Sequence, residues 1–124
     1  MPTRFSKPIL ATLEQSKILG IRVGSNHRFI GIWVVVVERR VFVRSWALKP
    51  DGWYNTLLKE PQATIDVNGR RLRVRSIRTK SERLKSAVDG AYKRKYNTPG
   101  SFAYVRGFSR PKRRNTTLEL VPLL

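Results

Sequence analysis

The chain has 124 residues, a length that suits one domain with a single core. Lysine and arginine number 26 against eight aspartates and glutamates, so the formal net charge is +18 and an anionic partner is expected. Hydrophobic residues make up 40% of the sequence, which excludes wholesale disorder, and the lack of cysteine excludes disulfides, cysteine nucleophiles and Cys-ligated zinc.

The N-terminal part predicts a helix and then a strand. Pro8 suits the first turn of a helix, and the apolar residues after it place this helix at about residues 8–16. Residues 18–23 have extended character and end at a turn-rich cluster, residues 24–26. His27, beside this turn, is either a general base or phosphate contact or, more simply, an exposed turn residue.

The apolar run at residues 30–37 predicts one strand that is buried on both faces. A polar break at residues 38–40 separates it from a second β-branched and aromatic run, residues 41–46. We expect the two runs to pair as an antiparallel hairpin at the centre of the sheet. The turn-forming residues 49–52 lead into a short helix, residues 53–59, which we expect to pack over a barrel end.

The clearest hairpin in the sequence joins residues 62–67 to residues 70–78. Its turn, Asn68-Gly69, suits the two positive-φ positions of a type I′ turn. Because side chains alternate between the faces of a strand, the returning strand places apolar residues on the core face and three guanidinium groups on the other. These guanidinium groups belong to Arg71, Arg73 and Arg75.

A capping box at residues 79–82, followed by apolar residues at helical spacing, predicts an amphipathic helix over about residues 80–96. Two further strands are expected at residues 102–108 and 116–121, joined by a basic loop at residues 109–114. The whole pattern predicts about seven strands and three helices in one domain, residues 1–124.

The sequence contains neither a membrane-spanning run nor a signal-peptide pattern. The apolar run at residues 30–37 is much shorter than the roughly 20 residues that a spanning helix needs, and no apolar segment follows the basic N-terminus. With one histidine and scattered carboxylates, no metal site is expected. These observations favour a cytoplasmic protein.

Residues 70–114 hold 16 of the 26 basic residues but only two acids, Glu82 and Asp89. Clustered Lys and Arg release counterions when they contact phosphates, and interleaved aromatic rings can stack on unpaired bases. Nucleic-acid binding is therefore one alternative function, although the same residues also suit an ordinary solvated surface. Its candidate residues are Arg71, Arg73, Arg75, Arg110, Lys112, Arg113 and Arg114, and the interleaved aromatics are Tyr92, Tyr96, Phe102, Tyr104 and Phe108.

The carboxylates lack the paired spacing of a hydrolase, and neither a dinucleotide fingerprint nor a P-loop is present, so side chains would have to hold a phosphate. Arg44 and Lys49 offer charge for this purpose, and Ser45 offers a hydroxyl donor. Tryptophans beside them provide flat apolar walls, which suits a flavin-like phosphate ligand. Alternatively, Trp46 and Trp53 simply seal the barrel end.

The chain resembles a bacterial family of unknown function in several segments, among them IWVVVVERRVFVRSW, WYNTLLKEP, AVDGAYKRKY and TTLELVP. That family is similar to the FMN-binding split-barrel superfamily, which includes pyridoxamine-phosphate-oxidase-like proteins and deazaflavin-dependent nitroreductases. The resemblance covers roughly residues 30–122. In the deazaflavin group, a motif of the form W-x-x-N-L-x-x-x-P edges the cofactor site, and residues 53–61 are similar to it, with Asn55 one place early.

This resemblance implies a mainly-β (α+β) split barrel of about six to seven antiparallel strands with flanking helices, usually a homodimer. It also implies an FMN or deazaflavin cofactor near the subunit interface and an oxidoreductase acting on a small hydrophobic substrate, in which the cofactor carries the hydride chemistry. By position, Arg28, Arg44, Ser45 and Lys49 would contact the phosphate. The walls around the ring would be Trp46, Trp53 and Tyr54. A cofactor-free structural or interaction domain is the remaining alternative.

Overall fold

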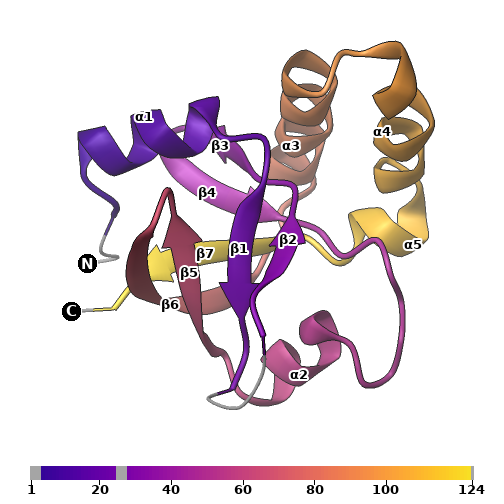
Figure 1. Cartoon of the computed structure of the whole chain (residues 1–124). Coiled ribbons are helices and arrows are strands. Elements are labelled where there is room, and N and C mark those ends of the chain that lie inside the picture. The colour runs from indigo at the N-terminus through magenta and orange to yellow at the C-terminus, as the bar shows by residue number, and fades with distance from the viewer. Residues whose placement is uncertain (1–3, 25–27, 124) are drawn as a thin grey trace.

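The structure is a computed structural model that describes residues 4–24 and 28–123 (Figure 1). His27 and most of the turn expected at residues 24–26 lie outside the described part. The first half contains α1 (Lys7–Gln15), β1 (Leu19–Arg22), β2 (Ile30–Ile32), β3 (Val35–Val37), β4 (Arg40–Val43) and α2 (Trp53–Lys59). The second half contains β5 (Gln62–Val67), β6 (Arg70–Arg78), α3 (Glu82–Lys95), a 3₁₀ turn η1 (Pro99–Ser101), α4 (Phe102–Phe108), α5 (Pro111–Arg114) and β7 (Leu118–Pro122).

The strands of the described residues form one antiparallel sheet in the order β2-β1-β5-β6-β7-β4-β3. The two edge strands, β2 and β3, are separated along the chain only by Trp33 and Val34. Three residue steps reach at most about 11 Å, so the two edges of the sheet must lie close together. The sheet therefore curls into the half-closed barrel of Figure 1, which confirms the predicted architecture.

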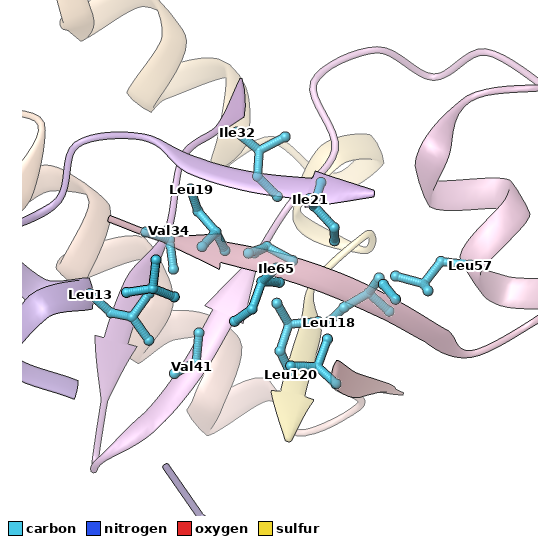
Figure 2. Packing of buried hydrophobic residues seen from close by; sticks show 14 of the residues in the cluster. Leu13, Leu19, Ile21, Ile32, Val34, Val41, Leu57, Ile65, Leu118 and Leu120 are labelled. Carbon is cyan, nitrogen blue, oxygen red and sulfur yellow. The ribbon is translucent and has the colours of Figure 1, made fainter. Parts of the chain in front are cut away.

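The hollow of the curled sheet is filled by a buried apolar cluster (Figure 2). Leu13 of α1 and Leu57 of α2 both enter this cluster and are fully buried. Figure 1 shows these two helices on opposite sides of the barrel, so α2 packs over a barrel end as expected. The strand residues labelled in Figure 2 are Leu19, Ile21, Ile32, Val41, Ile65, Leu118 and Leu120, and Val34 joins them from the link between β2 and β3.

A second buried cluster lies between α3 and the outer face of β3 and β4. Val35 and Phe42 come from the strands, Val88 and Tyr92 come from α3, and Phe108 comes from α4. The amphipathic helix predicted at about residues 80–96 is therefore confirmed, and its apolar face covers one side of the barrel. Its N-cap, however, is Ser81 and not Thr79, because Ser81 Oγ accepts a hydrogen bond from the Leu84 amide (3.2 Å).

The run at residues 30–37 is not a single strand, contrary to the prediction. It divides at Trp33 and Val34, so that β2 pairs with β1 while β3 pairs with β4. The Tyr96 hydroxyl fixes this division, because it accepts a hydrogen bond from the Val34 amide (3.1 Å) and donates one to Lys17 O (2.6 Å). The β3–β4 hairpin forms as predicted, but it lies at an edge of the sheet and not at its centre, and β4 ends at Val43.

The region after α3 also differs from the prediction. The expected strand at residues 102–108 is helix α4, and the expected basic loop contains the short helix α5. Val105 and Phe108 are both buried, and their three-residue spacing places them on one face of α4 toward the second cluster. The aromatic and β-branched composition of this segment favoured a strand, but its packing beside α3 selects a helix.

Two hairpin turns use residues with positive φ. Asn68 (51°) and Gly69 (88°) form the predicted turn between β5 and β6, which pair in the expected register. Glu38 (54°) and Arg39 (60°) form the turn between β3 and β4. Side chains other than Gly, Asn and Asp adopt this conformation at a cost, so the second turn stores local strain.

Candidate functional site

A groove of about 590 Å³ opens between β2, the segment that follows β4, and α4. Most of its lining is apolar, and the charged side chains among the described lining residues are Arg44 and Lys49. The isoleucines of the lining are Ile30 and Ile32 of β2 and Ile18, which lies just before β1. The aromatic lining consists of Trp33, Trp46, Trp53, Tyr104 and Phe108.

Trp46 forms a fixed wall of this groove. The guanidinium carbon of Arg113 lies 3.9 Å from the centre of the indole ring, and its Nε donates to Trp46 O (2.8 Å). Gly107 of α4 lies against the same ring so closely that a Cβ at this position would be 2.5 Å from the indole. Trp46 is therefore held in one place, although 37% of the residue stays exposed.

Trp33 forms the base of the groove, at the point where the chain crosses from β2 to β3. Its ring stacks on Tyr96 with centroids 4.0 Å apart and an interplanar angle of 4°. Phe108 (5.7 Å) and Tyr104 (6.0 Å) meet the same indole at steeper angles. An array of aromatic rings thus connects the groove to the second buried cluster and makes the base rigid.

Arg44 has partners inside the protein, where the sequence predicted a phosphate contact. Its guanidinium donates to Asp89 Oδ1 (2.6 Å), to Thr117 Oγ1 (2.8 Å) and to the carbonyl oxygens of Phe108 and Lys85 (both 3.0 Å). The side chain has no exposed surface. A guanidinium has five N–H donors, and the protein engages four of these, so Arg44 ties the groove wall to α3, to α4 and to Thr117, the residue before β7.

The neighbouring Ser45 is also turned inward. Its hydroxyl donates to Ala47 O (2.6 Å), and its amide donates to Thr116 Oγ1 (2.9 Å). Both groups serve to hold the segment after β4 in its path. Ser45 does not line the groove.

The other predicted residues take three kinds of position. Lys49 and Trp53 line the groove, and Lys49 is exposed at its rim. Tyr54 is buried behind Trp53 in the barrel core, with the two rings perpendicular and 6.3 Å apart. Arg28 is exposed just before β2 and is not among the lining residues. The structure thus brings Arg44, Trp46, Lys49 and Trp53 together and leaves Arg28, Ser45 and Tyr54 outside the lining.

Asn55, the residue that departs from the deazaflavin motif, has a structural contact. Its side-chain amide donates to Lys49 O (2.8 Å), and the Gly52 amide donates to the same oxygen (3.0 Å). The start of α2 therefore fixes the turn that carries Lys49.

Sequence reasoning missed several lining residues. The sequence pattern predicts Trp33 inside one long strand, and it predicts Tyr104 and Phe108 in a strand where the structure has helix α4. The pattern predicts Ile18 and Ile30 as ordinary strand residues, yet they are 56% and 46% exposed at the groove. None of these positions carries a local sequence signal, because the groove exists only once β2 and β3 separate.

The basic residues of the nucleic-acid alternative fall into two groups. Arg71, Arg73 and Arg75 are exposed on the outer face of β6. In the other group, Arg113 lies on Trp46, and Arg114 donates to Glu82 Oε1 (2.7 Å) and Asp89 Oδ2 (3.0 Å), while Arg110 and Lys112 are exposed. Of the aromatics interleaved with them, Tyr92, Tyr96 and Phe108 are buried in the second cluster and cannot stack on bases.

Two further observations concern cofactors and membranes. Over residues 4–24 and 28–123, no group of three or more His, Cys, Asp or Glu side chains could hold a metal ion. In the same ranges, no helix is long and apolar enough to cross a membrane.

Comparison with known proteins gives a family and a fold. The model of a family described as uncharacterized protein conserved in bacteria, DUF2255, matches residues 12–120. A search of curated proteins gives no match.

Two solved structures are similar to this chain. The conserved hypothetical protein Rv2991 from Mycobacterium tuberculosis is 12% identical with a TM-score of 0.58, and the match covers 98% of this chain and 82% of that one. A Listeria innocua protein provisionally named pyridoxamine 5′-phosphate oxidase is 11% identical with a TM-score of 0.59, over 94% of this chain and 90% of that one. At these identities the likeness shows the fold, which is the predicted split barrel.

Proposed function

The chain belongs to the bacterial family DUF2255, and we propose that it binds a flavin-like cofactor, FMN or a deazaflavin coenzyme, in the groove between β2 and α4. The observation that carries this proposal is the groove itself, where three tryptophans surround an apolar space with a lysine at its rim. The likeness of the fold to a provisionally named pyridoxamine 5′-phosphate oxidase supports the same class of cofactor.

The ring system of such a cofactor suits the apolar part of the groove. The volume of about 590 Å³ lies within the range of roughly 300–1,000 Å³ that is typical of small-molecule sites. Stacked and edge-on aromatic contacts add about 0.5–1.5 kcal/mol each beyond the burial of apolar area. Because Trp46 and Trp33 are already fixed by Arg113 and Tyr96, little ordering is needed when a ring binds.

The phosphate contacts follow a different arrangement from the one that the sequence predicted. The Arg44 donors are directed at Asp89, Thr117 and two carbonyl groups, which leaves Lys49 as the exposed cation of the lining. We assign the main phosphate contact to Lys49, with Arg28 as a second cation near the start of β2. Arg44 and Ser45 act as positioning residues, since they fix the segment that carries Trp46 and Lys49.

We further propose that the protein is an oxidoreductase for a small hydrophobic substrate. A bound flavin or deazaflavin supplies the hydride chemistry. The lining residues of the described part include neither histidine nor carboxylate, so the task of this chain is to orient the ring, exclude water and offer apolar walls to the substrate.

A second copy of the chain would complete the site. Ile18 (56%), Ile30 (46%) and Tyr104 (48%) are unusually exposed for large apolar residues, and all three line the groove. Contiguous exposed apolar surface of this kind marks an interaction site in a monomer. We propose a homodimer that covers this rim. Sedimentation of the wild type and of Ile30→Glu tests it, with a dimer expected for the former and a monomer for the latter.

A fluorescence titration with FMN, with a deazaflavin coenzyme and with ADP tests the cofactor proposal. ADP is the control because a protein with a net charge of +18 attracts any phosphate. We expect saturable binding of one ring system that ADP does not match. Equal, weak binding of all three ligands that disappears as salt is added would contradict the proposal.

Two matched variants localise the site. Lys49→Ala removes the exposed cation of the groove, whereas Lys80→Ala removes an exposed lysine between β6 and α3. We expect the first to weaken cofactor binding by about tenfold, which corresponds to about 1.4 kcal/mol, and the second to change it by less than about twofold. Equal effects would show that the net charge alone attracts the ligand.

A further inference from the structure

The outer face of β1, β5 and β6 forms a second surface, separate from the groove. The helices that cover the outside of the barrel pack on β3 and β4. On β6, by contrast, Arg71, Arg73 and Arg75 are exposed. Figure 1 shows β1, β5 and β6 on the side of the barrel away from α3 and α4.

Strand pairing gathers four guanidinium groups on this face. Arg22 of β1 lies opposite Thr64 of β5, and Thr64 lies opposite Arg73 of β6. Arg71 and Arg75 flank Arg73 on the same side of the strand. Arg22 and Arg73 also line a hollow of about 640 Å³, together with Lys59 from the end of α2.

Three of these guanidinium groups, those of Arg22, Arg71 and Arg73, are held by neighbouring side chains, and the face is still accessible. The Phe29 ring centre lies 4.7 Å from the guanidinium carbon of Arg22 and 4.8 Å from that of Arg71. Arg73 donates to Thr64 Oγ1 (2.9 Å) and to Gln62 Oε1 (3.3 Å). The Arg71 side chain remains 60% exposed. Ordering of this kind reduces the entropy that arginine loses when it binds an anion.

The acids on this face do not neutralise it. Asp66 Oδ2 lies 3.7 Å from Arg71 Nε, a distance too long for a strong hydrogen bond, and Glu60 lies at the edge of the hollow. The two carboxylates face four arginines and Lys59. The basic segment near α5 differs, because Arg113 lies on Trp46 and Arg114 pairs with Glu82 and Asp89.

We propose that this arginine face, defined by Arg22, Arg71, Arg73 and Arg75, binds the phosphodiester backbone of a nucleic acid. Alternate residues along a strand repeat every 6.6–6.8 Å or so, so the arginines of β6 distribute positive charge over about 13 Å. Such a line suits successive phosphates better than one small anion. Guanidinium groups also contact phosphate oxygens in pairs, which an ammonium group does not do.

The side chains of this face also indicate which part of a nucleic acid it contacts. The Phe29 ring is occupied by two arginines and is not free to stack on a base, so binding depends on the backbone and not on base sequence. Among the described residues of β1, β5 and β6, the exposed large apolar side chain is Ile77. The face therefore lacks the apolar residues that insert into a lipid surface, which favours nucleic acid over an anionic membrane.

The test is fluorescence anisotropy of a labelled 20-base-pair DNA duplex and of a 20-nucleotide RNA over a series of NaCl concentrations. Arg71→Gln, Arg73→Gln and Arg75→Gln are combined in one variant. The control variant combines Lys93→Gln, Arg94→Gln and Arg106→Gln, at exposed positions on α3 and α4. Both variants lower the net charge of +18 by three, so a difference between them is not an effect of net charge.

We expect the wild type to bind both probes, with an affinity that falls steeply as salt increases. Each phosphate contact contributes about 0.9 to the steepness of log K against log salt. The variant without Arg71, Arg73 and Arg75 should therefore have a slope that is less steep by about 2–3, and its affinity should be at least tenfold lower. The control should change the affinity by less than about threefold. No binding by the wild type at 100 mM NaCl, or equal losses in the two variants, would overturn the proposal.

Two additional measurements test the role of the guanidinium groups and the membrane alternative. The first is a variant that retains the charge, in which Arg71→Lys, Arg73→Lys and Arg75→Lys are combined. Its salt dependence should equal that of the wild type, while its affinity should fall by about three- to tenfold. An unchanged affinity would show that positive charge alone, and not the guanidinium groups, accounts for the binding.

The second measurement uses vesicles rich in phosphatidylserine. Binding to these vesicles that requires the β6 arginines, without binding to either nucleic acid, would assign the face to a membrane and overturn the proposal.

Discussion

Replacement of Arg44 tests whether its main role is to stabilise the fold. In Arg44→Met, the hydrogen bonds to Thr117, to Asp89 and to the carbonyls of Phe108 and Lys85 are lost at once. Removal of one partner of a buried ion pair costs about 3–5 kcal/mol. Asp89 keeps its bond to Arg114 (3.0 Å) and is 23% exposed, so we expect a loss near 3 kcal/mol, the lower end of that range.

The assay is urea unfolding followed by tryptophan fluorescence and by circular dichroism. Domains of this size are stable by about 5–15 kcal/mol, so the variant should fold with a clearly lower midpoint. Arg44→Lys retains the charge but not the fork of donors, and we expect it to fall between Arg44→Met and the wild type. Lys49→Ala is the matched control and should change the stability by less than about 0.5 kcal/mol. An Arg44→Met variant as stable as the wild type would refute the structural assignment of Arg44.

Four other variants test separate features of the structure. Gly107→Ala places a Cβ 2.5 Å from the Trp46 ring, so it should cost about 1–3 kcal/mol by overpacking and weaken cofactor binding, whereas an unchanged urea midpoint would contradict the packing of Trp46. The combined change Glu38→Asn and Arg39→Gly places residues that tolerate positive φ in the β3–β4 turn and should raise the stability by up to about 1 kcal/mol. A lower urea midpoint would show that loss of the Arg83–Glu38 ion pair outweighs the relief of backbone strain. Tyr92→Phe removes a buried hydroxyl without a hydrogen-bond partner in the described residues, so thermal unfolding should show equal or greater stability, and a loss above about 1 kcal/mol would indicate a hidden partner. Burial lowers the pKa of Lys95 from 10.5 to about 8, so between these pH values the unfolded chain binds more protons than the folded one. The free energy of unfolding should therefore rise from pH 8 toward pH 10. This rise should disappear in Lys95→Met.

The barrel could be predicted where local signals and packing agree. The β5–β6 hairpin follows from Asn68-Gly69 and from the alternation on β6, and α3 follows from its apolar spacing. The division at Trp33 and Val34 could not be predicted, because both halves of that run are apolar. It is set by the Tyr96 hydroxyl, which comes from a residue 62 positions further along the chain.

The site was only partly predictable for a similar reason. Trp46, Lys49 and Trp53 lie close together in the sequence, between a strand end and the start of a helix, and the structure brings them together at the groove. Arg44 lies on the same segment, but its direction depends on Asp89 and Thr117 from distant elements. Tyr104 and Phe108 depend on α4 being a helix, which its packing and not its composition determines.

The most direct test of the central claim is the affinity of the wild type for FMN and for a deazaflavin coenzyme at 150 and 500 mM NaCl. Burial of a ring against Trp33, Trp46 and Trp53 contributes most of the expected affinity, and apolar burial is not screened by salt. We therefore predict saturable binding of one ring system with an affinity that changes by less than about tenfold between the two salt concentrations. Binding that disappears at 500 mM NaCl, or that ADP reproduces, would contradict the assignment of the groove as a cofactor site.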